Sequence, residues 1–213
     1  MTETLAVKID GWAHGEAIPE KFAFGIPAED GPMTFGPNIS PRISWSGAPE
    51  GTKSFAIICN DPDVPSVADD VNKEGVSIPA SLPRVDFYHW VLVDIPASMT
   101  EIPEGGDSDG VTVGGKPAGK TDHGVRGLNT YTMFLAGNDD LKGKYAGYDG
   151  PCPPWNDTLL HHYHFTVFAL DVPSLNLGAE FGGEEALKAM EGHVLAQGAW
   201  MGTYSLNPSV RGA

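Results

Sequence analysis

The stretch that decides the fold runs from Gly147 to Val172 and reads GYDGPCPPWNDTLLHHYHFTVFALDV. Its first half is rich in glycine and proline, which force the chain into a loop with tight turns. Its second half, from about His161 to Leu170, alternates with period two and carries many aromatic and β-branched residues, so it predicts a buried strand. The alternation puts His161 and Tyr163 on one face, side by side at the mouth of the strand. That arrangement is typical of a small polar pocket on an apolar body.

Length and composition favour one β-rich domain over residues 1–213, a chain long enough to bury a proper core. The counts of 27 glycines and 18 prolines favour many turns, and runs that would form helices are few. The formal net charge is −15, with only 13 Lys and Arg residues. This balance excludes the basic surface that nucleic acid or an anionic membrane would require.

The cysteines and the N-terminal residues bear on the compartment. Cys59 and Cys152 lie far apart in sequence and form no metal-type pair, so we expect free thiols in a reducing environment. Residues 1–15 lack the apolar segment of a signal peptide, and no apolar run is long enough to span a bilayer. We therefore expect a cytoplasmic location, no transmembrane segment and no cofactor.

Apolar periodicity predicts the remaining elements. Strands are expected over Leu5–Ile9, Ile43–Trp45, Ser54–Asp61, Phe87–Ile95 and Trp200–Leu206. Pro62 is expected to end the third of these, because proline cannot continue a central ladder. Residues 183–196 have helical spacing, with Gly198 as a stop, and residues 130–136 fit a short strand or a helix.

Polar residues recur at the ends of the apolar strands. Asp61 and Asp63 are two apart, so they could face the same way, although an ordinary Asx turn explains them equally well. His89 shares its parity with Phe87, while Trp90 is expected to point away. A lone strand histidine is usually a core or edge residue.

The polar set is completed by His161 and Tyr163, which join Asp61, Asp63 and His89. Burying these groups without hydrogen-bond partners would cost much free energy. Such groups are expected to satisfy one another or a ligand.

Three motifs, in this order, carry a resemblance to a known family: Asp61-Pro-Asp63-Val-Pro65, the His89-Trp90 strand, and GPCPP at 150–154 followed by His161-His-Tyr163. They resemble the signature of the phosphatidylethanolamine-binding protein (PEBP) family, and most closely its bacterial Raf-kinase-inhibitor-like branch. The resemblance implies a mainly β fold of two antiparallel β-sheets with Greek-key connections and a few peripheral helices, including one near the C-terminus. It also implies a cavity for anions or phosphorylated head groups, and a homodimer.

By position, the resemblance assigns a set of ligand-binding residues: Asp61, Asp63, His89, Gly150, Pro153, Pro154, His161 and Tyr163. Protonated imidazoles would donate to an anion, so binding is expected to weaken as the pH rises through the ordinary histidine range. The carboxylates would repel the anion unless they orient the imidazoles or one of them is protonated.

Two segments depart from the family pattern. Residues 155–160 stand where the family often has a Gly or Lys-Gly pattern. This difference could narrow the mouth of the cavity. Residues 125–144 look like an insertion near the rim, which could be a lid or an oligomer contact, but a tolerated surface insertion is the favoured interpretation. The long loop over residues 67–86 could also reach the rim.

Two other function classes stay open. The Asp and His residues could serve an enzyme such as a hydrolase, with or without a metal, but no HExxH spacing and no nucleophile beside a base appears. A regulatory protein that binds an unidentified protein partner is the other class. A binding protein for a small anionic or phosphorylated ligand, without catalytic or metal-ligating residues, is the favoured hypothesis.

Overall fold

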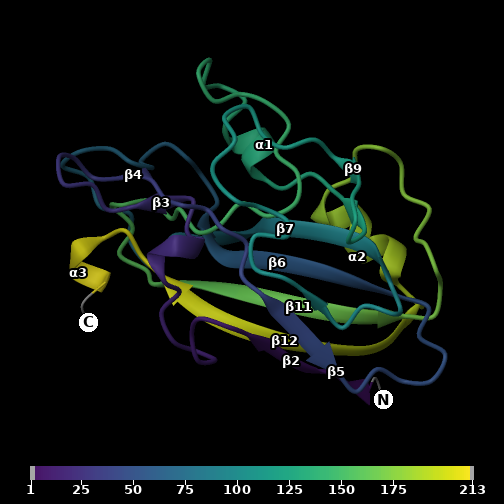
Figure 1. The fold of residues 1–213 in the computed structure, drawn as a ribbon. Helices are drawn as coiled ribbons and strands as arrows, with labels where there is room; N and C mark the ends of the chain where they lie inside the picture. The colour runs from purple at the N-terminus through teal and green to yellow at the C-terminus, as the bar shows by residue number, and fades with distance from the viewer. Residues whose placement is uncertain (1–2, 212–213) are drawn as a thin grey trace.

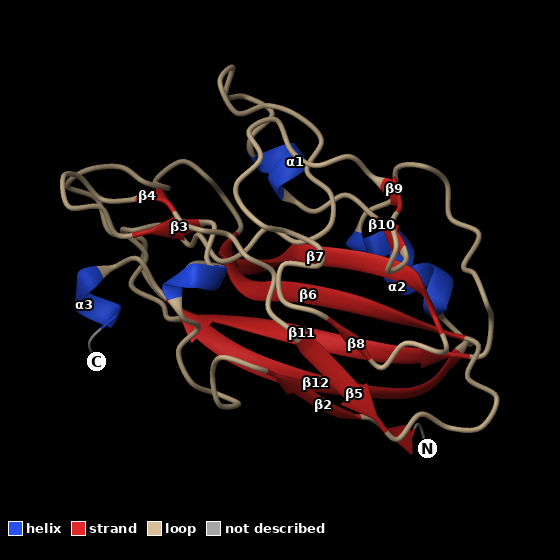
Figure 2. Cartoon of the chain, in the orientation of Figure 1, coloured by secondary structure: helices blue, strands red, loops and turns tan. Residues whose placement is uncertain are grey.

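The structure is a computed structural model that describes residues 3–211, and it is mainly β (Figures 1 and 2). The strands are β1 (Glu3–Thr4), β2 (Ala6–Ile9), β3 (Gly25–Ile26), β4 (Thr34–Phe35), β5 (Ile43–Ser46), β6 (Ser54–Pro65), β7 (Arg84–Pro96), β8 (Glu101–Ile102), β9 (Gly119–Lys120), β10 (Val125–Arg126), β11 (His161–Leu170) and β12 (Val194–Tyr204). The helices are a 3-10 turn η1 (Glu20–Phe22), α1 (Tyr131–Phe134), α2 (Gly183–Met190) and α3 (Pro208–Arg211).

Seven strands form the large sheet, in the order β1-β12-β11-β6-β7-β10-β9, and β2-β5-β8 form a smaller one. Both sheets are antiparallel except for the edge pair of β1 with β12. A short ribbon of β3 and β4 lies apart from both. The expected mainly β fold with two antiparallel sheets and peripheral helices is therefore confirmed.

The main core lies between the two sheets. Ile9 and Ile43 from the smaller sheet pack with Phe55 and Phe165 from the large one, as the period-two pattern predicts. The opposite face of the large sheet is covered by α2, whose Met190 joins a second apolar cluster (Figure 1).

The strand that carries Asp61 is longer than expected. Pro62 does not end it, since β6 continues to Pro65. Pairing with β11 stops at Asn60, and the register with β7 is interrupted between Asp61 and Val64. No ladder hydrogen bond is needed from position 62, so a proline is tolerated there.

The predicted helix over residues 183–196 is too long. It ends at Met190, Gly192 turns the chain with φ +81°, and β12 begins at Val194. The proposed helix stop at Gly198 lies inside β12, where an added Cβ would stand 2.2 Å from the Leu5 carbonyl oxygen. Close strand packing, and not helix termination, therefore requires this glycine.

The face predicted for Trp90 is wrong, because β7 contains a β-bulge. Cys59 pairs with Trp90 while the next residue of β6, Asn60, pairs with Tyr88, so His89 is an extra residue in β7. A bulge places two consecutive side chains on the same side of a sheet. Trp90 therefore joins the same core cluster as Tyr163 instead of pointing away, and its indole donates to Asp107.

Candidate functional site

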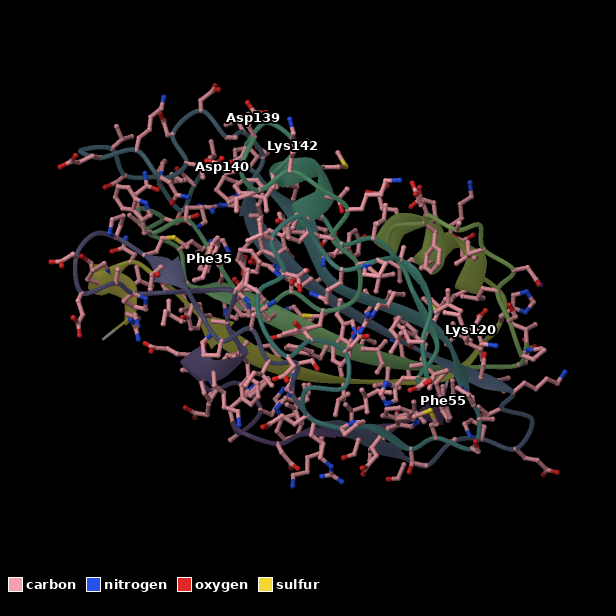
Figure 3. The ribbon with its side chains drawn as sticks, turned by 45° about the horizontal axis from the view of Figure 1, so that its top comes forward. Phe35, Phe55, Lys120, Asp139, Asp140 and Lys142 are labelled. Carbon is pink, nitrogen blue, oxygen red and sulfur yellow. The ribbon has the colours of Figure 1, made fainter. Side chains whose placement is uncertain are left out.

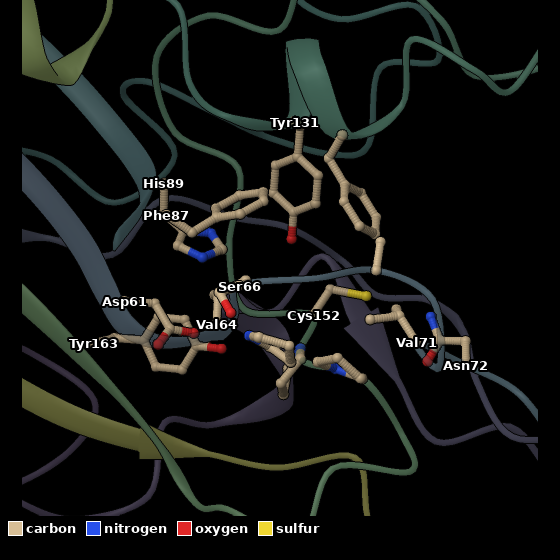
Figure 4. Close-up of a pocket in the computed structure, with 15 residues that line it drawn as sticks. Asp61, Val64, Ser66, Val71, Asn72, Phe87, His89, Tyr131, Cys152 and Tyr163 are labelled. Atoms are coloured by element: carbon tan, nitrogen blue, oxygen red, sulfur yellow. The ribbon is translucent and has the colours of Figure 1, made fainter. Parts of the chain in front are cut away.

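Three adjacent strands deliver polar side chains to one cavity of about 170 Å³ (Figure 4). Asp61 comes from β6, His89 from the bulge in β7 and Tyr163 from the mouth of β11. All three side chains are buried. Pro153 and Pro154 line the cavity from the loop that precedes β11. Five of the predicted site residues thus share one cavity.

His161 lies behind Asp61 and does not line the cavity. Its Nδ1 is 2.7 Å from Asp61 Oδ2, and its Nε2 is 3.2 Å from Asp157 Oδ2. The Arg84 guanidinium donates to both carboxylate oxygens of Asp157. Asp61, His161, Asp157 and Arg84 therefore form a buried chain of alternating charge, in which two cations balance two carboxylates.

This chain sets the charge of His161. Burial opposes the imidazolium, but hydrogen bonds and charge from Asp157 and Asp61 outweigh it and raise the pKa of His161 to about 9. Burial would raise the pKa of Asp157, yet its hydrogen bonds with His161 and Arg84 lower that pKa to about 2. At neutral pH His161 is thus a fixed cation behind the carboxylate of the cavity.

His89 has the opposite environment. Burial lowers its pKa, and the charge of Asp61 and the carbonyl of Asp149 only partly oppose this. Its Nδ1 is 2.9 Å from the Asp149 carbonyl oxygen. Of the two predicted donors, one is neutral and the other stays charged up to about pH 9 and lies outside the cavity. These environments do not favour the expected loss of binding through the ordinary histidine range.

Asp63 and Gly150 are also absent from the cavity lining. The backbone N–H of Asp63 donates to Asp61 Oδ1 at 2.8 Å, so the Asx turn that the sequence allowed is present. The Asp63 carboxylate turns instead to His162, accepting from its backbone N–H and contacting its ring. An added Cβ at Gly150 would stand 1.9 Å from the Phe22 carbonyl oxygen, so this glycine permits close packing of the loop behind the wall.

Aromatic residues that the motifs did not single out complete the cavity. Phe87 and Tyr131 line it together with Phe134, and the Tyr131 ring lies edge-on to Phe87 at 5.0 Å between centroids. Tyr131 donates its hydroxyl hydrogen to the Gly150 carbonyl. The parity of Phe87 with His89 was the only sequence signal that pointed to any of them.

The 125–144 segment is therefore more than a surface insertion. Helix α1 contributes Tyr131 and Phe134 to the wall, whereas the loop that follows extends into solvent, as Figure 3 shows for Asp139 and Lys142. The favoured interpretation holds only for this outer loop. The 67–86 loop reaches the rim as expected, through Ala68, Val71 and Asn72.

One polar group in the cavity is unsatisfied. The Tyr163 hydroxyl is fully buried and has no hydrogen-bond partner of normal geometry within residues 3–211. Burial raises its pKa well above 10, and the Asp61 carboxylate adds to this rise through its charge and its close approach to the hydroxyl, so Tyr163 stays a neutral O–H. A buried hydroxyl without a partner is costly, and a ligand in the cavity would satisfy it.

The chemistry of the remaining groups is limited. Burial raises the pKa of Cys152 to about 12, so this thiol at the cavity wall is not activated as a nucleophile. Both cysteines are free, as expected. Within the described chain, no three His, Cys, Asp or Glu side chains are arranged to hold a metal ion. Residues 3–211 also contain no helix with the length and apolarity needed to cross a bilayer.

The fold and the site together define a mainly β protein with a small polar cavity at the end of its large sheet. Comparison with known proteins identifies the family. The sequence model of the phosphatidylethanolamine-binding protein family matches residues 8–205. The chain belongs to this family.

The chain is similar to UPF0098 proteins of bacteria and archaea, which confirms the expected bacterial branch. It is 34% identical to one from Methanothermobacter thermautotrophicus over 79% of this chain and 84% of that one. It is 33% identical to one from Aquifex aeolicus over 96% of this chain and 98% of that one.

Two crystal structures share the fold. Escherichia coli YbcL, described as a new member of the mammalian PEBP family, superposes with a TM-score of 0.67 at 27% identity, over 94% of this chain and 98% of that one. CT736 of Chlamydia trachomatis superposes with a TM-score of 0.63 at 26% identity, over 96% of this chain and 99% of that one.

Proposed function

We propose that this protein binds a small anionic or phosphorylated ligand in the cavity formed by Asp61, His89 and Tyr163, without turning it over. The observation that carries the proposal is the buried Tyr163 hydroxyl that lacks a partner. It faces a cavity whose walls are mostly aromatic side chains, prolines and aliphatic side chains, with Ser66 and Asn72 at the exposed rim (Figure 4). Pockets of this kind use few polar groups to orient a ligand on an apolar surface.

The Asp61 carboxylate is compatible with an anion because its charge is compensated from behind. His161 is a buried cation at 2.7 Å, and the second carboxylate of the chain, Asp157, has Arg84 as its own partner. Removing the cation would leave an unpaired buried carboxylate facing the ligand. His161 therefore supports binding without touching the ligand.

The size and charge of the protein favour a head group or soluble metabolite over a membrane-embedded lipid. A cavity of about 170 Å³ accommodates a small group and leaves no room for acyl chains. The net charge of −15 would oppose docking on an anionic bilayer.

Calorimetry with phosphate and with phosphoethanolamine tests this function. We expect both to bind the wild type, and Tyr163→Phe, which keeps the ring and removes only the hydroxyl, to bind at least about tenfold more weakly. Tyr145→Phe is the matched control, because Tyr145 is equally buried but bonds to Leu141 outside the cavity.

Vesicles of phosphatidylethanolamine and phosphatidylcholine form a separate arm, which distinguishes a lipid head group from a free one. Binding to vesicles alone would point to the lipid. Equal affinities of wild type and Tyr163→Phe for every probe would refute the assignment of the site.

The resemblance supports two further parts of the proposal, a homodimer and a cytoplasmic location. Light scattering of the purified protein tests the first, and fractionation of cells that produce the full chain tests the second. If the protein also regulates a protein partner, the outer part of residues 125–144 is the segment to delete in a pull-down.

A further inference from the structure

The hydrogen-bonding roles inside the cavity are settled by its buried surroundings. His89 Nδ1 lies 2.9 Å from the Asp149 carbonyl oxygen. A carbonyl oxygen can only accept, so Nδ1 carries the hydrogen. In a neutral imidazole the other nitrogen, Nε2, then carries a lone pair. His89 lines the cavity with this acceptor nitrogen as its free polar atom (Figure 4).

The Asp149 carbonyl is held firmly in place. The Asp149 carboxylate accepts from Lys116 Nζ at 2.7 Å, and from Asn38 and Asn129 side-chain amides at 2.8 Å each. Asn38 also accepts the Gly150 N–H at 2.8 Å. With both sides of the Asp149–Gly150 peptide tied down, the carbonyl cannot rotate away from the imidazole. The tautomer of His89 is therefore built into the fold.

The groups that face His89 come from every neighbouring element. Asp61 approaches from β6, Asp149 from the loop before β11, Tyr163 from β11 and Tyr131 from α1. The two tyrosines are neutral, and the two carboxylates have their own cations in His161 and Lys116. The charges of Asp61 and Asp149 favour a second proton on the imidazole, but burial outweighs them and keeps His89 neutral.

Asp61 is a second acceptor in the same cavity. Its Oδ1 accepts one hydrogen bond, from the Asp63 N–H at 2.8 Å, and its Oδ2 accepts one from His161 at 2.7 Å. An ionised carboxylate has about four lone-pair sites. Asp61 thus retains acceptor capacity towards the cavity that it lines.

The donors inside the cavity are few by comparison. No Lys or Arg side chain lines it, and the side chains of Ser66 and Asn72 can donate only from its exposed rim. In the buried interior, the unpartnered Tyr163 hydroxyl supplies a single O–H. An oxyanion without a hydrogen would place acceptor oxygens against the Asp61 carboxylate and the His89 lone pair. Leaving buried acceptors unpaired in this way is a strong basis for rejecting a ligand.

We propose that the cavity selects a tetrahedral anion that carries its own proton, such as hydrogen phosphate or the monoanion of a phosphate monoester, over a fully deprotonated oxyanion such as sulfate. The P–O–H group donates to Asp61 or His89, and Tyr163 donates to an ionised oxygen of the ligand. This inference rests on the proposed function and adds a selectivity to it.

The test is calorimetry with inorganic phosphate and with sulfate near pH 7.5, where phosphate keeps a proton and sulfate has none. We expect the wild type to bind phosphate at least about tenfold more tightly than sulfate. Loss of one hydrogen bond to a charged group produces a ratio of about this size. In Asp61→Asn the amide can donate to a sulfate oxygen, so the ratio should fall to about threefold or less. Asp63→Asn is the matched control and should keep the wild-type ratio, since Asp63 faces His162 outside the cavity.

Nitrogen NMR of His89 provides an independent readout that does not depend on any variant folding. We expect hydrogen on Nδ1 and none on Nε2 near pH 7.5, and an imidazolium or the other tautomer would overturn the inference. Equal binding of phosphate and sulfate would also overturn it and leave the proposed function standing. A phosphate monoester has a second pKa of about 6, so phosphoethanolamine is tested near pH 5.5, where it keeps a proton. If neither inorganic anion binds and phosphoethanolamine does not bind at that pH, the proposed function fails and the selectivity fails with it.

Discussion

The buried charge chain behind the cavity makes the stability of this protein depend on pH in a specific way. His161 is fully buried between Asp61 and Asp157, and its pKa rises from the ordinary 6.5 to about 9. At about 1.36 kcal/mol per pH unit, this rise corresponds to about 3 kcal/mol of folding free energy. The lowering of the Asp157 pKa from 3.8 to about 2 corresponds to about 2 kcal/mol. The two figures describe the same cluster and are not additive.

The sign follows from which state holds the proton more tightly. Below about pH 6.5 both the folded and the unfolded chain are protonated at His161, so the full stabilisation is present. Between 6.5 and about 9 the unfolded chain loses its proton first, and the stabilisation declines to near zero. We therefore expect the free energy of unfolding to fall by about 2 to 3 kcal/mol over this window.

Urea unfolding near pH 6 and near pH 9.5, followed by tryptophan fluorescence, measures this loss. Asp157→Asn removes one charge from the cluster but keeps a hydrogen-bond acceptor, so the loss should shrink and move to lower pH. Asp171→Asn is the control, because the His193–Asp171 pair is 43% exposed on both sides and should leave the profile unchanged. The reasoning is wrong if the free energy of unfolding of Asp157→Asn falls between pH 6.5 and about 9 as much as that of the wild type does. It is also wrong if NMR shows His161 titrating near pH 6.5.

Three further predictions concern packing, the rim and the thiol. Gly198→Ala should cost about 1 to 3 kcal/mol in urea unfolding, because its Cβ would meet the Leu5 carbonyl at 2.2 Å, while Gly178→Ala, in open space, should cost far less. Phe134→Ala should weaken calorimetric binding of phenyl phosphate and leave inorganic phosphate unaffected, because Phe134 lines the cavity and is 49% exposed; equal effects on both would contradict its place at the rim. Iodoacetamide should modify Cys152 slowly at pH 8, since burial raises its pKa to about 12, and labelling at the rate of a free thiol in solution would contradict this.

Much of the fold could be predicted from the sequence, because period-two alternation reports directly on which face of a strand is buried. The pattern in β11 placed Tyr163 with Phe165 on the core side, and the structure keeps both fully buried there. The same pattern gave a wrong prediction for β7. A bulge adds a residue without changing the local composition, so His89 and Trp90 lie on the same side of the sheet, although consecutive strand residues normally lie on opposite sides.

The predicted ends of β6 and α2 were wrong for a related reason. Local rules take Pro62 as the end of a strand and Gly198 as the end of a helix. Whether a strand accepts a proline or a glycine at such a position depends on which strand lies beside it. Neighbouring strands come from distant parts of the chain and are not visible in a local window.

By itself, the sequence determined the family, the β-rich fold, and the grouping of Asp61, His89 and Tyr163 into one site. Only the tertiary structure decided that His161 stands behind the cavity, that Asp63 faces away from it, and that α1 completes the wall. It also decided the charges, because the pKa of a histidine depends on burial and on partners far away in the chain. His161 meets Asp61 across 100 residues and is held as a cation, while His89 meets a carbonyl in an apolar wall and is held neutral. Two histidines that look alike in the sequence therefore play opposite roles, because each one's environment forms only when the chain folds.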